Sequence, residues 1–230
     1  MATTATTAAQ PRWVRRKQAR PSELLAAALA LFVEKGYAGT RLDDVAARAG
    51  VSKGTLYLYF ANKEELFKAV VRENIVRNIA EAQQLVRGYD GDTAELLAYL
   101  MREWWRRIGD TPASGIPKLV IGESGNFPEI ARFYIDEVID PVHRLLAGVL
   151  ERGIRRGEFR KVETETFVRV MIAPLVMLLL WRHSLGPCGN QPVDPQRYVA
   201  IHIDNVLRAL RREAAPASGA AAAARRRTAR

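Results

Sequence analysis

The chain has 230 residues, of which 48% are hydrophobic, and a formal net charge of +10. This length allows one large or two small domains with a sizeable core. A single cysteine, Cys188, excludes an internal disulfide framework and a cysteine-rich metal site. The longest apolar run, 170–181, contains Pro174 and is shorter than the roughly 20 residues of a membrane span, so we expect a buried helix and no membrane anchor.

The positive charge is concentrated at the two ends of the chain. Residues 1–75 hold 12 Lys/Arg against 7 Asp/Glu, residues 76–210 hold 17 of each, and residues 211–230 hold 6 against 1. This distribution predicts a polyanionic partner, either nucleic acid or an anionic membrane surface, with solvated tails as the alternative. We interpret 1–20 as a flexible basic arm, with an organelle transit peptide as the alternative, and 214–230 as a disordered basic tail.

The first folded segment has the pattern of an amphipathic helix. Apolar residues recur at i, i+3, i+4, i+7 and i+8 from Leu25 to Val33, and Gly36 can end the helix in a left-handed conformation. Thr40 is a candidate N-cap for a second, shorter helix, with Asp43 as a shortened capping box. Gly50 would end that helix.

Residues 56–60, LYLYF, have strong strand propensity but stand between two helix-start signals. Ser52 precedes them as a possible N-cap, and Asn62 follows with Glu65 as a capping box. No other alternating segment in the first 100 residues could pair with a strand here, so we predict a helix.

At 100° per residue, the predicted helix has two distinct faces. Leu56 and Phe60 face the core, while Gly54, Thr55 and Leu58 face outward. A helix, a short helix, a glycine turn and another short helix make a helix-turn-helix, whose second helix suits the major groove of DNA.

The run from Leu24 to Leu66 resembles the N-terminal domain of the TetR/AcrR family of bacterial transcriptional regulators. The positions that match are Gly36-Tyr37, Thr40, Val45-Ala46, Ala49-Gly50-Val51-Ser52, Gly54, Tyr57, Tyr59-Phe60, Lys63 and Leu66. The resemblance implies DNA contacts to bases or phosphates from Thr40, Arg41, Lys53, Gly54, Thr55, Tyr57, Leu58, Tyr59 and Lys63. A purely structural role in the core is the alternative for the two tyrosines.

The rest of the chain also reads as helices. We expect them at 62–86, 92–108, 118–124, 127–136, 138–156, 163–183 and 194–212, with a breaker-rich link at 112–117. The predicted fold is therefore all-α with about nine helices. It comprises a helix-turn-helix domain at 21–70 and an effector-binding and dimerisation domain at 71–213.

The resemblance further implies a small effector bound among the helices of the larger domain. Aromatic and methionine side chains suit an apolar, flat ligand, although core packing is an equal alternative for each of them. The predicted contacts are Met101, Trp104, Trp105, Ile108, Phe133, Tyr134, Met171 and Met177. Arg106 and Arg107 are candidates to anchor an acidic head group, with solvated helix charges as the alternative.

Two apolar helices near the C-terminus suggest a four-helix dimer interface, as the resemblance also implies. Helix 163–183 is apolar almost all round, and the last helix carries a stripe at i, i+4, i+7, i+8 and i+11. The predicted interface residues are Leu178, Trp181, Val199, Ile203, Val206, Leu207 and Leu210. An intramolecular core is the alternative.

Catalytic and metal-binding motifs are not evident. The three histidines stand alone, and we find no glycine-rich phosphate loop, Cys-His pair or serine elbow. We therefore expect no enzyme activity, no cofactor and no metal. The expected function is a cytoplasmic, homodimeric repressor released from a palindromic operator by a small, largely apolar effector. A sequence-nonspecific DNA-coating protein and a membrane-surface protein are the alternatives.

Overall fold

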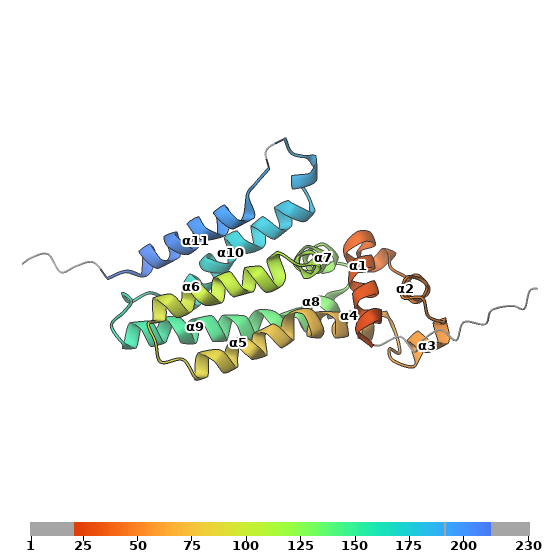
Figure 1. The fold of residues 1–230 in the computed structure, drawn as a ribbon, viewed down its shortest axis with the longest axis horizontal. Helices are drawn as coiled ribbons and strands as arrows, with labels where there is room; N and C mark the ends of the chain where they lie inside the picture. The colour runs from red at the N-terminus through yellow and green to blue at the C-terminus, as the bar shows by residue number, and fades with distance from the viewer. Residues whose placement is uncertain (1–20, 191, 213–230) are drawn as a thin grey trace, which may run out of the picture.

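The computed structural model describes residues 21–190 and 192–212, so the predictions for the arm and the tail lie outside the described residues. Within these ranges the chain forms nine helical rods and no strand, which confirms the all-α fold (Figure 1). Three rods make the small N-terminal domain: α1 (Pro21–Gly39), α2 (Leu42–Arg48) and α3 (Lys53–Tyr57).

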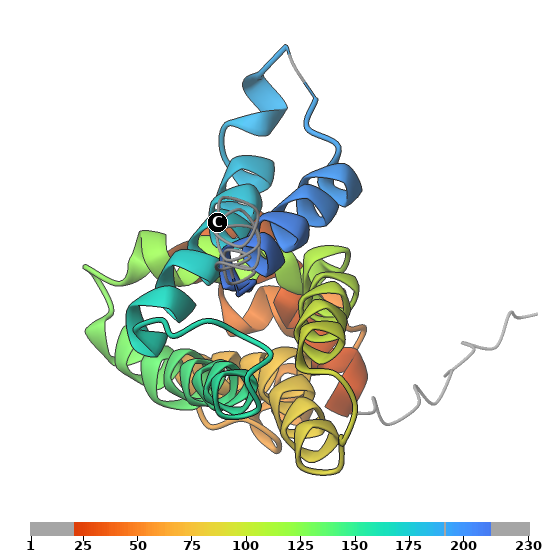
Figure 2. The same ribbon diagram turned by 90° about the vertical axis from the view of Figure 1, so that its left-hand side faces the viewer.

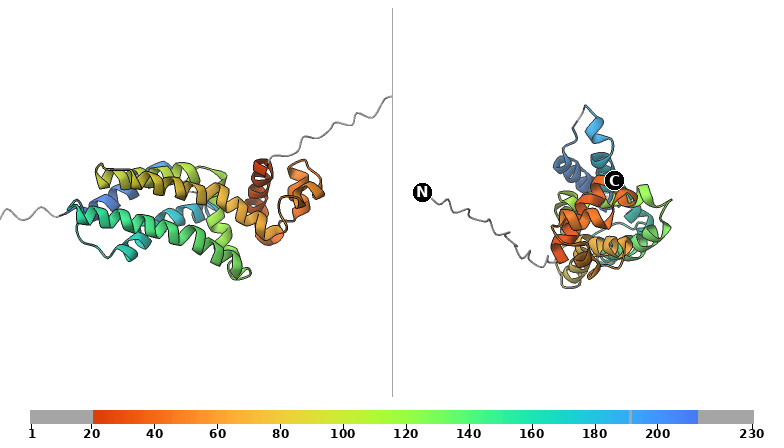
Figure 3. Two further views of the ribbon diagram at one scale, coloured as in Figure 1. Left: turned by 90° about the horizontal axis from the view of Figure 1, so that it is seen from below. Right: turned by 90° about the vertical axis from the view of Figure 1, so that its right-hand side faces the viewer.

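The fourth rod joins this domain to the rest of the molecule. It runs from α4 (Lys63–Val71) through a π-helical turn, η1 (Arg72–Val76), into α5 (Arg77–Arg87) without a break. Seen from below in Figure 3, it extends along the whole length of the larger domain beside α9. The expected single helix at 62–86 is therefore present, and it belongs to both domains.

Five further rods complete the larger domain. They are α6 (Thr93–Trp104) with the π turn η2 (Trp105–Gly109), α7 (Ile116–Glu123), α8 (Pro128–Tyr134) continuing through η4 (Ile135–Ile139) into α9 (Asp140–Arg155), α10 (Thr164–His183) and α11 (Pro195–Leu210). Short 3-10 turns, η3 (Pro112–Gly115) and η5 (Gly186–Cys188), precede α7 and follow α10. Figure 2 shows α10 and α11 as a hairpin on one side of the bundle.

Two details of the predicted boundaries are wrong. The expected break between helices 127–136 and 138–156 is absent because the π turn η4 keeps the backbone helical there. The 112–117 link is also shorter than expected. Residues Pro112–Gly115 form η3, and α7 already begins at Ile116 because Pro117 fits the first turn of a helix.

The two domains share one buried cluster. It contains Leu24, Phe32 and Leu66 of the small domain together with Ile108 and Ile116 of the larger one. A Cβ atom on Gly115 would lie 2.7 Å from the Val33 side chain, so glycine is needed for the close approach of η3 to α1. A second cluster fills the far half of the bundle, between α6, α9, α10 and α11.

Helix α10 is the described helix that is long and apolar enough to cross a membrane by length and composition alone, with a mean hydropathy of 1.6 over its best window. One such helix is weak evidence, because core helices pass the same test. Its side chains at 168, 171, 175, 178 and 179 are buried within the bundle. Only 28% of that window is buried, so α10 packs into the core with one face and exposes the other.

Candidate DNA-binding surface and effector cavity

The predicted helix is present but shorter than expected: Leu56 and Tyr57 end α3, and Leu58 and Tyr59 form the turn after it. The Ser52 hydroxyl accepts a hydrogen bond from the Thr55 N–H at 3.1 Å, and Asn62 accepts one from the Glu65 N–H at 2.8 Å. These two caps start α3 and α4 and limit the sequence between them to one short helix. Gly50 has φ 71°, which allows the tight turn between α2 and α3.

The side chains of α3 and the turn after it sort to the expected faces. Leu56 is fully buried, whereas Leu58 is 84% exposed, and Tyr57 and Tyr59 are each 45% exposed. Gly54 is also exposed, and a Cβ atom there would meet only the Ser52 hydroxyl at 3.8 Å. The two tyrosines are thus available at the surface, which argues against a purely structural role for them.

Charged side chains around α3 are mostly paired with one another. Lys53 Nζ lies 2.9 Å from Asp43 Oδ1, and this hydrogen bond raises the pKa of Lys53. Arg48 and Lys35 pair with carboxylates on neighbouring helices. Arg41 is exposed and has no ion pair with any residue in the described ranges. Among the described residues, Arg41 is thus a cation of this face without an ion-pair partner.

Thr40 does not have the expected role. The N-cap of α2 is Arg41, with no side-chain cap bond, and Thr40 is only 1% exposed. Its hydroxyl donates to the carbonyl oxygens of Gly36, at 2.7 Å, and Leu31, at 3.2 Å. The end of α1 curls back over Thr40, so its hydroxyl closes that helix instead of facing DNA. The prediction of Thr40 as an N-cap is wrong, and its burial does not support the predicted phosphate contact.

Thr40→Val should lower the free energy of unfolding by about 1–3 kcal/mol, because it removes a buried donor and leaves its carbonyl partners without it. Urea denaturation of the two proteins measures this difference. The volume of the side chain is nearly unchanged, so a cavity makes little contribution. Equal stability would contradict the assigned role of the hydroxyl.

Lys63 is likewise hydrogen-bonded to α1. Its ammonium donates to the carbonyl oxygens of Tyr37, at 2.8 Å, and Ala38, at 3.3 Å, and lies 4.5 Å from the centre of the Tyr37 ring. Burial lowers the pKa of Lys63 and is the largest cause that raises the pKa of Tyr37 to about 12. The expected phosphate contact by Lys63 is therefore not supported, since its donors already fix α4 to α1.

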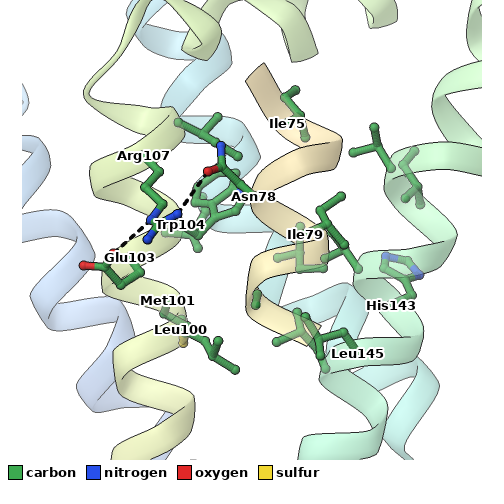
Figure 4. A pocket seen from close by; sticks show the side chains of 18 of the residues that line it. Ile75, Asn78, Ile79, Leu100, Met101, Glu103, Trp104, Arg107, His143 and Leu145 are labelled. Carbon is green, nitrogen blue, oxygen red and sulfur yellow. Dashed lines mark hydrogen bonds and ion pairs between the residues drawn. The ribbon is translucent and has the colours of Figure 1, made fainter. Parts of the chain in front are cut away.

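A cavity of about 330 Å³ lies in the larger domain, between α5, α6, α7, α9 and α10 (Figure 4). Five of the eight predicted effector residues line it: Met101, Trp104, Ile108, Tyr134 and Met171. The other lining side chains are mostly apolar. This volume is within the range of small-molecule sites.

Three predicted effector residues do not line the cavity. Trp105 is buried in the second core cluster, since adjacent residues on a helix point about 100° apart and Trp104 takes the cavity side. Phe133 packs against Lys68 and Arg72: the Lys68 ammonium and the Arg72 guanidinium lie 5.8 and 5.2 Å from the centre of its ring. Met177 is 60% exposed on the outside of α10.

The effector contacts predicted from the sequence omit the rod formed by α4, η1 and α5, which also lines the cavity. Ile75, Ile79 and Ala82 line it at i, i+4 and i+7 of the 62–86 helix. That apolar stripe was visible in the sequence and could have been found. Val120 and Ile121 of α7 also line the cavity, but α7 is too short for a clear periodic signal.

Three π-helical turns surround the cavity. Each contributes lining residues: Ile75 from η1, Ile108 from η2 and Val138 from η4. The side chains of Arg72 and Glu137 join η1 to η4 through two hydrogen bonds of 2.9 and 2.6 Å. Such wide turns often occur at functional sites in helices.

The charged side chains of the cavity neutralise one another. Arg107 of η2 donates to Glu81, to Asn78 at 3.2 Å and to Glu103 at 3.0 Å (Figure 4). These hydrogen bonds join α5 to the rod formed by α6 and η2. Hydrogen bonds from Arg106 and Arg107 lower the pKa of Glu103 to about 2. Arg106 is exposed and pairs only with Glu103. The guanidinium of Arg107 is therefore already bound by carboxylates.

Comparison with known proteins gives the family. A family model described as "Bacterial regulatory proteins, tetR family" matches residues 24–70, and one for a tetracyclin repressor-like C-terminal domain matches residues 90–188. Together they cover more than half of the chain. The protein belongs to the TetR family. It is a transcriptional regulator with a helix-turn-helix, as the sequence predicts.

Relatives of this TetR-family protein include a fatty acid metabolism regulator protein of Bacillus subtilis, 27% identical over 68% of this chain and 80% of that protein. The repressor KstR2 of Rhodococcus jostii is 27% identical over 83% of this chain and 92% of its own. The structure of B. subtilis FadR in complex with stearoyl-CoA has the same fold, with a TM-score of 0.69, 21% identity and coverage of 83% and 100%. Mycobacterium tuberculosis KstR2, a ketosteroid transcriptional regulator, has a TM-score of 0.66, 24% identity and coverage of 86% and 98%.

Most of the predicted dimer residues of this TetR-family chain lie inside the protomer. Leu178, Val199, Ile203, Val206 and Leu210 are buried in the core of their own protomer, as the intramolecular alternative held, and Leu207 is partly buried against it. Trp181 is exposed. The apolar side chains that α10 and α11 expose are instead Val170, Met177, Trp181 and Ile201.

Proposed function

We propose that this protein is a homodimeric repressor that leaves a palindromic operator when a small, largely apolar molecule fills the cavity. The observation that carries this proposal is the continuous rod α4–η1–α5. Lys63 and Leu66 of the rod hold α1, while Ile75 and Ile79 of the same rod line the cavity. A ligand that displaces this rod shifts the helix-turn-helix with it.

The exposed face of α3 and its flanks would contact the operator. Lys53, Gly54, Thr55 and Leu58 lie where bases approach, and Tyr57, Tyr59 and Arg41 lie where phosphates do. Leu58 offers only an apolar contact, such as one to a thymine methyl group, so direct readout of bases is limited. Operator choice therefore depends partly on DNA shape.

The exposed stripe on α10 supports dimerisation. Val170, Met177 and Trp181 recur at i, i+7 and i+11, and Ile201 of α11 adds to this apolar face. Pairing α10 and α11 with their copies would form a four-helix bundle around a two-fold axis. Two recognition helices related by that axis require a palindromic operator with half-sites about one DNA turn apart.

The relatives support an apolar effector and a cytoplasmic location, where bacterial operators are found. Stearoyl-CoA is bound in the B. subtilis FadR structure, and KstR2 is described as a ketosteroid regulator. A stearoyl chain and a ketosteroid both have large apolar parts. The cavity here is lined mainly by aliphatic and aromatic side chains, which suits the same chemistry.

The decisive experiment is sequencing the genomic fragments that the purified protein retains. We expect a few fragments that share one palindrome, and a footprint confined to it. Uniform protection along the DNA would instead indicate the DNA-coating alternative. Candidate effectors are then tested for release of the enriched fragment.

Ligand binding should change the fluorescence of Trp104 and not that of Trp105, because only Trp104 lines the cavity. Trp104→Phe is expected to remove most of the ligand-dependent change in emission. Trp105→Phe is the matched control and should retain it. Loss of the signal in the control with retention in Trp104→Phe would place the ligand on the other side of α6.

A further inference from the structure

We propose that the effector presents an uncharged hydrogen-bonding group, a ketone carbonyl or a hydroxyl, to the hydroxyl group of Tyr134 in the cavity. Tyr134 is then a specificity-determining residue, and free carboxylates are disfavoured in the cavity. This inference rests on the proposed function of the cavity as the effector site.

Tyr134 combines burial with an unused polar group. The residue is 9% exposed and lines the cavity, yet its hydroxyl has no hydrogen-bond partner among residues 21–190 and 192–212. In that part of the chain, the Thr93 hydroxyl and the Trp105 indole nitrogen are the unpartnered polar side-chain atoms that are fully enclosed. The Tyr134 hydroxyl keeps some accessible surface, and because this residue lines the cavity we place the hydroxyl toward it.

The surroundings of this hydroxyl favour its neutral form. Burial raises the pKa of Tyr134 well above its usual value, and burial is the cause identified for that shift. A neutral hydroxyl in such surroundings gains from any acceptor or donor that a ligand brings. Tyr134 belongs to the buried cluster shared with the small domain, so the contact would form at the end of the cavity nearest the helix-turn-helix.

Other polar side chains of the cavity offer little to an anion. Asn78, Glu81 and Glu103 all bind Arg107 on one wall, and the two carboxylates also pair with Arg77 and Arg106. His143 also lines the cavity, and burial and the nearby Arg169 lower its pKa, so it is neutral at pH 7. A buried carboxylate would lose its hydration without meeting an unpaired guanidinium on this wall, which disfavours its binding.

Tyr99 provides an internal comparison. It is the second tyrosine that lines the cavity, but it is 41% exposed, so water can satisfy its hydroxyl. The two tyrosines share the same chemistry and differ in burial. Only Tyr134 should therefore distinguish ligands by their polar group.

The first test compares three ligands with one carbon skeleton: 2-undecanone, 2-undecanol and undecanoate at pH 7.5. Calorimetric titration should show the ketone and the alcohol binding at least about tenfold more tightly than the carboxylate. Tyr134→Phe should weaken ketone and alcohol binding about three- to tenfold and leave the carboxylate unchanged. Tyr99→Phe should leave all three unchanged. The inference is overturned if the carboxylate binds most tightly, if Tyr134→Phe has no effect on binding, or if none of the three ligands binds.

The second test requires no ligand. Because the Tyr134 hydroxyl has no partner in the described part of the chain, Tyr134→Phe should leave the melting temperature unchanged or raise it. A clear decrease would show that the hydroxyl serves the fold. Operator binding by Tyr134→Phe should equal that of the unmodified protein, and absence of operator binding in both would contradict the proposed function independently of the ligand class.

Discussion

Gly54→Glu should lower operator affinity by at least about 100-fold, or roughly 2.8 kcal/mol. Gly54 lies on the exposed face of α3, where a longer side chain would keep the helix from the base edges and a carboxylate would oppose the phosphates. The fold should tolerate the change, because a Cβ atom there meets nothing closer than 3.8 Å and glutamate favours helix more than glycine does. Gel-shift titration on the enriched operator measures the loss.

Gly148→Glu is the matched control for this substitution. Gly148 is exposed on α9 in the larger domain, and a Cβ atom there has no neighbour within 4 Å among the atoms of the structure. It adds the same charge to the protein far from α3. Operator affinity should stay within about twofold of the unmodified protein. Unaltered binding by Gly54→Glu would rule out α3 as the recognition helix.

Met177→Arg should convert the dimer to monomers at micromolar protein. Met177 is 60% exposed in the protomer, so the variant should fold normally. In the proposed bundle each copy would bury an unpaired guanidinium, which costs about 3–5 kcal/mol and raises the dissociation constant more than 100-fold. Sedimentation or light scattering reports the mass, and operator affinity should fall with the dimer.

Ile135→Arg serves as the control for the dimer test. Ile135 is also an exposed apolar residue, but it lies in η4, away from α10 and α11. That variant should remain dimeric. Met177 gives a clearer test of the interface than Leu207, because Met177 lies on the outward face of α10. An arginine at Leu207 would also disturb the protomer's own core. A dimeric Met177→Arg variant would place the interface elsewhere.

The sequence alone determined the local features of this protein. Ser52 and Asn62 cap the helices that the pattern assigned to them, and Asp92 and Asp194 cap the helices expected from 92 and 194, because a cap needs only residues three or fewer positions away. The faces of α3 followed from helical periodicity for the same reason. The motif of the helix-turn-helix was recognisable because it is a run of such local signals in one register.

The tertiary structure decided which surface covers each face. Periodicity showed that Val199, Ile203 and Val206 share one side of a helix, but not whether a partner or the protomer's own core covers it. It could not choose between Trp104 and Trp105, since either can face inward when α6 rotates by one residue. It also left Arg107 open, because Asn78 and Glu81 lie on another helix, and it assigned Thr40 to the start of α2 although its hydroxyl bonds back to the end of α1. Contacts between distant segments depend on how the helices pack, and that packing settled these residues.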